Sequence, residues 1–195
     1  LNEGTVYYWR VRPNNRCANG NFSETYSFQT GNSDCTNTFT ATDFTNATID
    51  PTPNVTGYVP IAVSGGLTIN SMTVTTDISH TWVQDLVVYV QEPAALGSNN
   101  INLLENPCDG TDDIQNTTFD DTAGALVCNG TAPAISGTYA PEDPLASTIG
   151  KNADGTWFVA AFDAYNQDGG QINSASITIC AAMAITNVPN FTNNG

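Results

Sequence analysis

Basic residues are scarce in this chain. Its 195 residues include only four lysines and arginines, against 19 aspartates and glutamates, and the formal net charge is −15. Three of the four basic residues, Arg10, Arg12 and Arg16, lie within the first sixteen positions. A nucleic-acid-binding surface needs basic side chains that neutralise phosphates, so this composition excludes nucleic acid as a partner. An acidic surface is compatible instead with divalent cations or a saline exterior.

Long apolar runs and helical periodicity are also missing. No stretch approaches the ~20 apolar residues of a membrane span, and the start of the chain, Leu1 rather than methionine, shows no signal-peptide pattern. The chain is rich in threonine, asparagine, glycine and aspartate, which is typical of β-rich extracellular proteins. We therefore expect an all-β domain that is secreted or displayed on a cell surface, and an internal fragment of a longer protein.

Catalytic motifs are absent as well. The sequence contains neither H-E-x-x-H nor G-x-S-x-G, and its one histidine is His80. A single histidine in an aromatic strand context is more often a hydrogen-bonded structural residue than a catalytic base. Carboxylates are plentiful, but the sequence does not single out a pair for glycoside hydrolysis. We expect that the chain is not an enzyme by itself.

The five cysteines indicate disulfides rather than a metal site. They form no C-x-x-C pair, and the single histidine argues against zinc. In a secreted protein the natural interpretation is disulfide bonding, with buried unpaired thiols as the alternative. Cys108 and Cys128 flank a polar loop that hydrophobic burial could scarcely hold, and closing about twenty residues would contribute roughly 3 kcal/mol. We expect these two cysteines to pair.

Alternating residues and turn signals outline the strands. Near the start, 5–12 and 26–30 alternate on either side of a turn at Asn19-Gly20. Between 67 and 78 the alternation changes parity, which predicts a bulge or a strand break near Asn70. The other clear strands are 85–91, 156–163 and 171–180. We interpret 31–38 as a linker. The expected division is 1–31, 36–180 and 181–195, the last a linker or the start of a further module.

Two stretches carry a family resemblance. Residues 137–180 read GTYAPEDPLASTIGKNADGTWFVAAFDAYNQDGGQINSASITIC, and upstream His80-Thr81-Trp82 leads into a strand that begins at Asp85. Together they resemble the P domain, or Homo B, the β-rich module that follows the catalytic domain in proprotein convertases. Such modules also occur in many secreted bacterial peptidases.

The P-domain resemblance covers 36–180 and has implications for fold and neighbours. It implies an antiparallel jelly-roll β-sandwich and a peptidase domain as the neighbour in the parent protein. Cys35 and Cys180 bracket this region, and neighbouring terminal strands would let them form a second disulfide. Cys17 is then left without a partner in this chain.

The first 31 residues carry a second resemblance. The sequence GTVYYWRVR, followed by a YSF strand, is similar to the last two strands of a fibronectin type III domain. Two strands alone are marginal in water, so we expect this hairpin to depend on neighbours. The order of the two modules is similar to that of secreted metallopeptidases and adhesins of the Bacteroidetes. The sequence Asp121-Thr122-Ala123 also resembles the O-glycosylation acceptor of that group.

Aspartates concentrate in 108–121, CDGTDDIQNTTFDD, without a basic residue. Asp120 and Asp121 end a strand, so one side chain should turn inward, and an inward carboxylate needs a counter-charge. With so few basic residues, a calcium ion is the simplest one, and Asp85 and Asp163 lie on core strands in the same situation. This arrangement resembles the calcium sites of P-like modules. The expected calcium ligands are Asp85, Asp113, Asp120, Asp121 and Asp163, and the sequence leaves the number of ions open. The alternative is that these acids only solvate a loop, and for Asp154 and Asp168 we favour ordinary turns.

Two functions from different classes follow. The first is a non-catalytic, calcium-stabilised accessory P-like domain of a secreted multidomain peptidase. The alternative is a spacer or a glycan- or surface-binding module of an adhesin or filament. Trp82 and Trp157 discriminate between them: in the first both are core residues, whereas in the second one is exposed beside the acidic loop.

Overall fold

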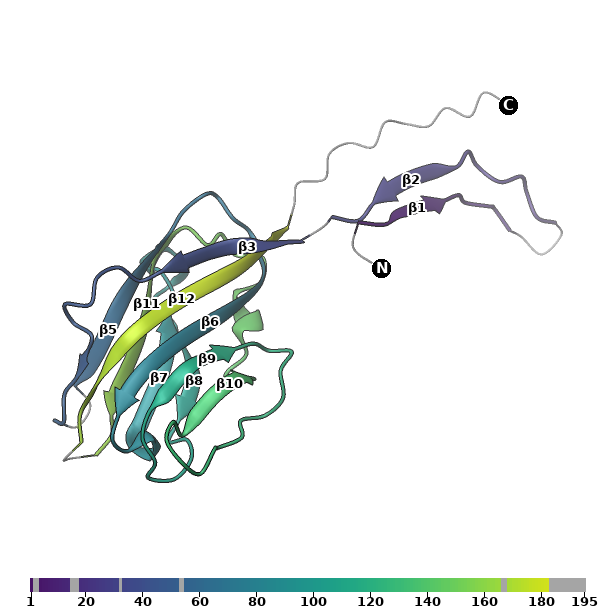
Figure 1. Cartoon of the computed structure of the whole chain (residues 1–195). Coiled ribbons are helices and arrows are strands. Elements are labelled where there is room, and N and C mark those ends of the chain that lie inside the picture. Colours follow the sequence, from purple (N-terminus) through teal and green to yellow (C-terminus); the bar gives the residue numbers. More distant parts are fainter. Residues whose placement is uncertain (2–3, 15–17, 32, 53–54, 166–167, 183–195) are drawn as a thin grey trace. The chain divides into compact units, whose positions relative to one another are not determined.

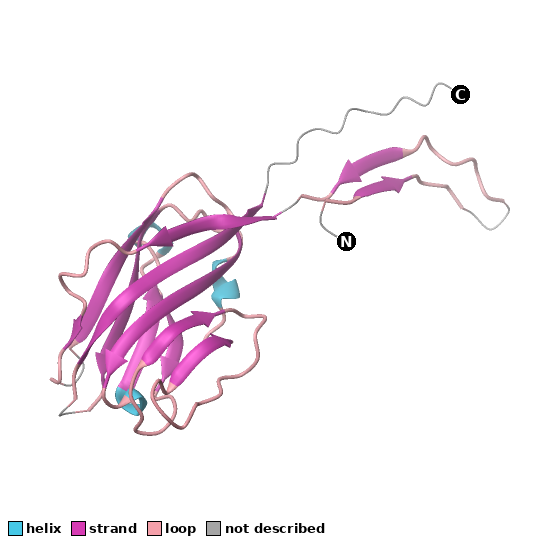
Figure 2. Cartoon of the chain, viewed as in Figure 1, coloured by secondary structure: helices cyan, strands magenta, loops and turns pink. Residues whose placement is uncertain are grey.

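The computed structural model describes residues 1, 4–14, 18–31, 33–52, 55–165 and 168–182. The chain divides into two compact units, one formed by Leu1–Asp34 together with Ala182–Gly195 and the other by Cys35–Ala181. Strands are the main regular secondary structure of both (Figures 1 and 2). Helical structure in the described residues consists of three short 3-10 turns, η1 (Val83–Asp85), η2 (Ala94–Leu96) and η3 (Leu145–Thr148). No helix in the described residues is long and apolar enough to cross a membrane.

The first unit contains an antiparallel hairpin. Its strands are β1 (Val6–Trp9) and β2 (Tyr26–Gln29), which lie within the strands expected from the alternation. Aromatic residues face each other across it: the Trp9 and Tyr26 rings stack with centroids 4.9 Å apart, and the rings of Tyr7 and Phe28 at 5.6 Å. The hairpin is therefore held by cross-strand aromatic pairs.

The second unit is a β-sandwich of two sheets. One sheet has the order β10 (Ile135–Tyr139), β9 (Ile114–Phe119), β6 (Ile69–His80), β12 (Gly170–Ala182) and β3 (Ser33–Thr40), with β4 (Thr48–Ile49) also paired to β12. The other has the order β5 (Thr56–Val63), β11 (Gly155–Asp163), β7 (Leu86–Gln91) and β8 (Asn100–Glu105). The all-β sandwich fold expected from the sequence is confirmed.

The core lies between the sheets because each central strand alternates. On β11, Trp157, Val159 and Ala161 are buried, and on β12, Ile177 and Ile179 are buried in the same hydrophobic cluster. Residues between them on each strand point away from the core. Burial of these alternating side chains is the main driving force for the sandwich.

Two details differ from the sequence-based expectation and one confirms it. Strand β3 occupies most of 31–38, the segment that the sequence pattern predicts to be a linker, because this Thr/Asn-rich segment completes the edge of the first sheet beside β12. Strand β10 pairs with β9 in parallel, not antiparallel, after a long connection that places it beside its predecessor in the same direction. The bulge near Asn70 is confirmed: Cys180 pairs with Ser71 and Ala181 with Ile69, so Asn70 is the additional residue.

Candidate functional site

The only histidine of the chain forms a buried pair with an aspartate. His80 ends β6 in one sheet and Asp163 ends β11 in the other. The Nε2 atom of His80 lies 3.4 Å from Oδ2 of Asp163, and neither side chain is exposed. Among the described residues neither atom has a hydrogen-bond partner of acceptable geometry, while Oδ1 of Asp163 accepts the Tyr165 N–H at 2.7 Å. The pair therefore links the two sheets by a polar contact inside an apolar core.

Backbone contacts orient the His80 ring. Its Nδ1 lies 3.2 Å from the Trp82 nitrogen and 3.0 Å from the Trp82 carbonyl oxygen. If Nδ1 accepts the Trp82 N–H, the ring carries its hydrogen on Nε2, where it faces the Asp163 carboxylate. Asp113 holds the same strand end, because its Oδ1 accepts the His80 backbone N–H at 3.0 Å. Of the predicted ligands, Asp113 is thus engaged with the backbone of His80.

Two further acids surround this strand end. Asp85 is partly buried in η1, and burial raises its pKa above the usual value, followed by the negative charges of Asp163 and Asp168. His80 acts in the opposite direction and lowers it. Asp168 accepts the Thr81 hydroxyl at 2.8 Å. Asp85 and Asp163, both predicted as ligands, are therefore close enough to repel each other, with Asp168 as a third carboxylate nearby.

Asp120 and Asp121 lie at the other end of β9. Asp120 Oδ1 accepts both the backbone N–H and the hydroxyl of Thr122 at 2.8 Å. Asp121 accepts the N–H groups of Leu145 and Ala146 at 2.8 and 2.7 Å, and so fixes the first turn of η3. Both carboxylates are satisfied by protein donors.

The five predicted ligands do not converge on one ion. Asp113 precedes β9 and Asp120 follows it, and at ~3.3 Å per residue an intact strand separates them by roughly 20 Å. Within the residues that the structure describes, no group of three or more His, Cys, Asp or Glu side chains is placed to hold a metal ion. Asp113 and the pair Asp120 and Asp121 thus lie at opposite ends of β9, which has a register shift opposite Asp77. The aspartates of 108–121 form one acidic segment in the sequence, but in the structure β9 divides them between its two ends.

Sequence reasoning missed a second buried acid. Glu92 is 2 % exposed, and its Oε1 lies 2.5 Å from Nζ of Lys151, the only lysine of the chain. Its other oxygen accepts the Asn99 amide at 2.8 Å. The sequence feature that could have indicated this ion pair is the single lysine, because one lysine among many acidic residues is expected to pair with one of them.

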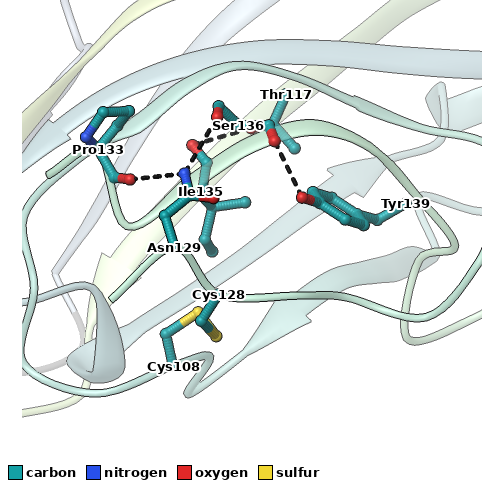
Figure 3. Close-up of a disulfide and its surroundings, with 8 residues drawn as sticks. All are labelled: Cys108, Thr117, Cys128, Asn129, Pro133, Ile135, Ser136 and Tyr139. Atoms are coloured by element: carbon teal, nitrogen blue, oxygen red, sulfur yellow. Dashed lines mark hydrogen bonds between the residues drawn. A yellow bond between two sulfur atoms is a disulfide. The ribbon is translucent and has the colours of Figure 1, made fainter. Parts of the chain in front are cut away.

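The structure pairs the cysteines as the sequence analysis expected. Cys35 is bonded to Cys180, and Cys108 to Cys128; Cys17 lies outside the described residues. Figure 3 shows the second disulfide beside Asn129, whose amide donates to the Pro133 carbonyl at 2.8 Å and to the Ser136 hydroxyl at 3.1 Å. The loop that follows β9 is therefore held by a covalent bond and side-chain hydrogen bonds rather than by a core of its own.

The two discriminating tryptophans differ in exposure. Trp157 is fully buried, and its indole N–H donates to the Ala153 carbonyl at 2.9 Å. Trp82 is 45 % exposed, and its ring covers Gly110 so closely that a Cβ there would lie 2.0 Å from Cζ2. Trp82 is thus the exposed tryptophan beside the acidic loop.

The sequence of this chain is similar to a segment of two proteases. No protein-family model matches it. It is 31 % identical over 119 residues to a calcium-dependent protease of Trichormus variabilis, a match that covers 61 % of this chain and 15 % of the protease. It is 29 % identical over 124 residues to a calcium-dependent protease of Nostoc sp., covering 64 % of this chain and 16 % of the protease. The chain therefore spans about a sixth of the length of these relatives.

Two solved structures of a serine protease from Aeromonas sobria match part of this chain in a structural comparison. The protease in complex with a chaperone gives a TM-score of 0.49 at 16 % identity, covering 76 % of this chain and 27 % of the matched chain. The protease alone gives 0.48 at 14 % identity, covering 74 % and 26 %. At these scores the two structures carry no further conclusion.

Proposed function

We propose that this chain is a non-catalytic accessory domain, of the P-domain type, from a secreted multidomain peptidase. The observation that carries the proposal is its similarity to a short segment of two calcium-dependent proteases, a segment that makes up 15 to 16 % of each. The disulfides, which are compatible with an extracellular protein, support secretion.

The position of the only histidine supports a non-catalytic role. His80 has no exposed side-chain surface and faces Asp163 in the core, so a substrate could not reach its ring. A hydrolytic dyad or triad built on this histidine would need an accessible base. A histidine-dependent peptidase activity of the parent protein would therefore use a histidine outside this chain.

The parent protein provides the test of the accessory role. Its reading frame should encode a peptidase catalytic domain, and deleting 35–181 should shorten the half-life of peptidase activity on heating. Replacing only 1–31 is the matched control, and should leave that half-life closer to the wild-type value. A parent protein without a peptidase domain, or a deletion that leaves heat resistance unchanged, would contradict the proposal.

Calcium stabilisation is proposed for the Asp85 end of the sandwich only. Carboxylate oxygens are the ligands that calcium prefers, and Oδ2 of Asp163 is buried without a hydrogen-bond partner, although no three acidic side chains of the described residues are already grouped around an ion. The raised pKa of Asp85, caused by burial and by Asp163 and Asp168, means that a cation would relieve an unfavourable charge there. His80 is the competing counter-group of Asp163. Asp120 and Asp121 lie outside this proposed calcium site, because each carboxylate already accepts two hydrogen bonds from backbone or hydroxyl donors.

Thermal melts of the chain in chelator, calcium and magnesium test this point. A site that binds only the folded state adds about 2.7 kcal/mol at 100 times the dissociation constant, and magnesium should substitute poorly. Asp85→Asn should abolish the gain, whereas Asp120→Asn, as the matched control, should retain it. An unchanged melting temperature in millimolar calcium would remove calcium from the proposal and leave the accessory role in place.

One observation favours the second candidate, a spacer or surface-binding module of an adhesin. Trp82 is exposed beside the acidic loop, which is the outcome expected for that function. We rank it second because one exposed tryptophan is common on protein surfaces. Both candidates can be true of one chain, since an accessory domain can also bind a surface.

A further inference from the structure

The outer face of the second sheet contains an aromatic hollow. On β11 the outward residues include Phe158, Ala160 and Phe162, while the inward ones fill the core. Ala160 pairs with Tyr58 of β5 on one side and with Tyr89 of β7 on the other. A small residue between two tyrosines leaves a depression at the middle of the sheet, and Ala160 forms its floor.

The rings around the floor are held in place by each other. Tyr58 meets Phe158 edge to face, with centroids 5.7 Å apart and planes at 81°. Tyr89 meets Phe162 at 6.5 Å and 61°. Such contacts between aromatic rings are favourable beyond burial alone, so the walls are ordered before any ligand arrives.

The resulting cavity has a volume of about 320 Å³ and is lined by Thr56, Tyr58, Tyr89, Gln91, Phe158 and Ala160. This is near the lower limit of small-molecule sites. None of the six lining residues is charged, although the chain carries a net charge of −15. The hollow therefore complements a neutral ligand that presents both apolar faces and hydroxyl groups.

A peptide fits this position poorly. The strands below the hollow, β11 and β7, are paired with neighbours on both sides. Their backbone groups are consequently used in the sheet and are not available for strand addition, the usual way in which a sheet binds an extended peptide. Above β11 and β7 recognition therefore has to come from side chains, and on the edge strand β5 the Tyr58 N–H already donates to the Asn46 carbonyl at 2.7 Å.

From this lining we propose that the hollow binds a neutral saccharide. Sugar rings offer C–H faces that pack on Tyr58, Tyr89 and Phe158, and hydroxyl groups that pair with hydroxyl and amide side chains. Gln91, whose amide donates to Asn100 Oδ1 at 2.9 Å, and Thr56 supply such groups at two edges of the cavity. The proposal gives the second candidate function a location, separate from Trp82, and does not depend on the peptidase role.

The test titrates the intact chain with cellohexaose, chitohexaose and laminarihexaose by calorimetry, and runs it in native gels that contain soluble β-glucan, xylan or mannan. We expect at least one of these neutral saccharides to bind. Tyr58→Ala and Tyr89→Ala should each weaken that binding about tenfold or more, and Ala160→Leu should abolish it by filling the floor. The melting temperature of each variant shows that it is folded, and the tyrosine variants lie on the outer face of the sheet.

Trp82→Ala and Tyr165→Ala are the matched controls, because both remove exposed aromatic rings outside the hollow. They should leave saccharide binding unchanged. No binding to any of the probes, binding that survives both tyrosine substitutions, or binding lost only in Trp82→Ala would overturn the proposal. So would a dimer that Tyr58→Ala dissociates, since a second copy would then occupy the hollow. None of these outcomes affects the heat-resistance test of the parent peptidase.

Discussion

The hairpin of the first unit and the sandwich of the second use the same aromatic residue types with opposite results. In the hairpin, Trp9 and Tyr26 stack on each other, yet each is 47 % exposed. In the sandwich, Trp157 and Phe119 are completely buried. Strand pairing is present in both, so the difference lies in the second layer: only a sandwich removes both faces of an aromatic ring from water. We therefore expect substitutions of disulfides and buried side chains to lower the free energy of unfolding strongly in the sandwich, and substitutions of aromatic residues in the hairpin to change it little.

The largest expected effect comes from the disulfide that joins the edge strand β3 to its neighbour β12. Cys35–Cys180 closes a sequence separation of 145 residues and Cys108–Cys128 one of 20. In the chain-entropy model these loops correspond to about 5 and about 3 kcal/mol. We expect the double substitution of Cys35 and Cys180 by serine to lower the free energy of unfolding more than that of Cys108 and Cys128. Urea unfolding without reductant measures both, and the reverse order would contradict the model.

A tryptophan from each region gives the next largest contrast. Trp157→Ala removes the largest fully buried side chain and leaves its cavity in the core, so we expect a loss of about 3 to 5 kcal/mol. Trp9→Ala in the hairpin should change the free energy of sandwich unfolding by less than about 0.5 kcal/mol. Denaturant unfolding, followed by far-UV circular dichroism, compares the two. Equal losses would mean that the sandwich depends on the hairpin.

The same contrast explains what the sequence could and could not predict. Strands with strict alternation, such as β11 and β12, were predictable because one face of each is buried, and the parity change at Asn70 identified the bulge. The sequence pattern does not predict β5, because Pro60 and Gly57 within it weaken the strand signal, although pairing with β11 fixes it in the sheet. A tertiary neighbour here overrides local propensity.

The candidate site was only partly predictable for a related reason. The sequence predicts that Asp163 is buried and therefore needs a partner of opposite charge. It does not predict that this partner is His80, because His80 lies on the opposite sheet and far away in the sequence. The aspartates around β9 lie close together in sequence, so they were grouped into one site. Their actual partners, the η3 backbone for Asp121 and Thr122 for Asp120, depend on where the chain returns.

A smaller effect is expected where a surface carboxylate holds the sandwich loops. Asp121→Ala removes the acceptor of two backbone N–H groups, those of Leu145 and Ala146, and should cost about 1 to 2 kcal/mol. Asp120→Ala is the matched neighbour. Its partner Thr122 lies in the same turn, so its substitution should cost less. Hydrogen exchange of the Leu145 and Ala146 amides should accelerate in Asp121→Ala and remain unchanged in Asp120→Ala.

The smallest effect expected concerns Asp85, and it depends on pH. Because burial, Asp163 and Asp168 raise its pKa in the folded state, the folded protein binds this proton more tightly than the unfolded chain does. The contribution of Asp85 to stability is thus fully present below the unfolded pKa of about 3.9 and is lost as the pH rises through the higher folded value. Asp85→Asn removes this dependence. In chelator it should be more stable than the wild type at pH 7 by a few tenths of a kcal/mol, since solvent screens a partly exposed carboxylate, and equal to it near pH 3. Glu24→Gln in the exposed hairpin is the matched control and should leave sandwich unfolding unchanged at both pH values.

Calcium should reverse the order of the two proteins at pH 7 if the proposed site exists, because only the wild type then gains stability. If Asp85→Asn is instead less stable than the wild type in chelator at pH 7, the Asp85 carboxylate makes a favourable contact in the folded state, and the prediction is wrong.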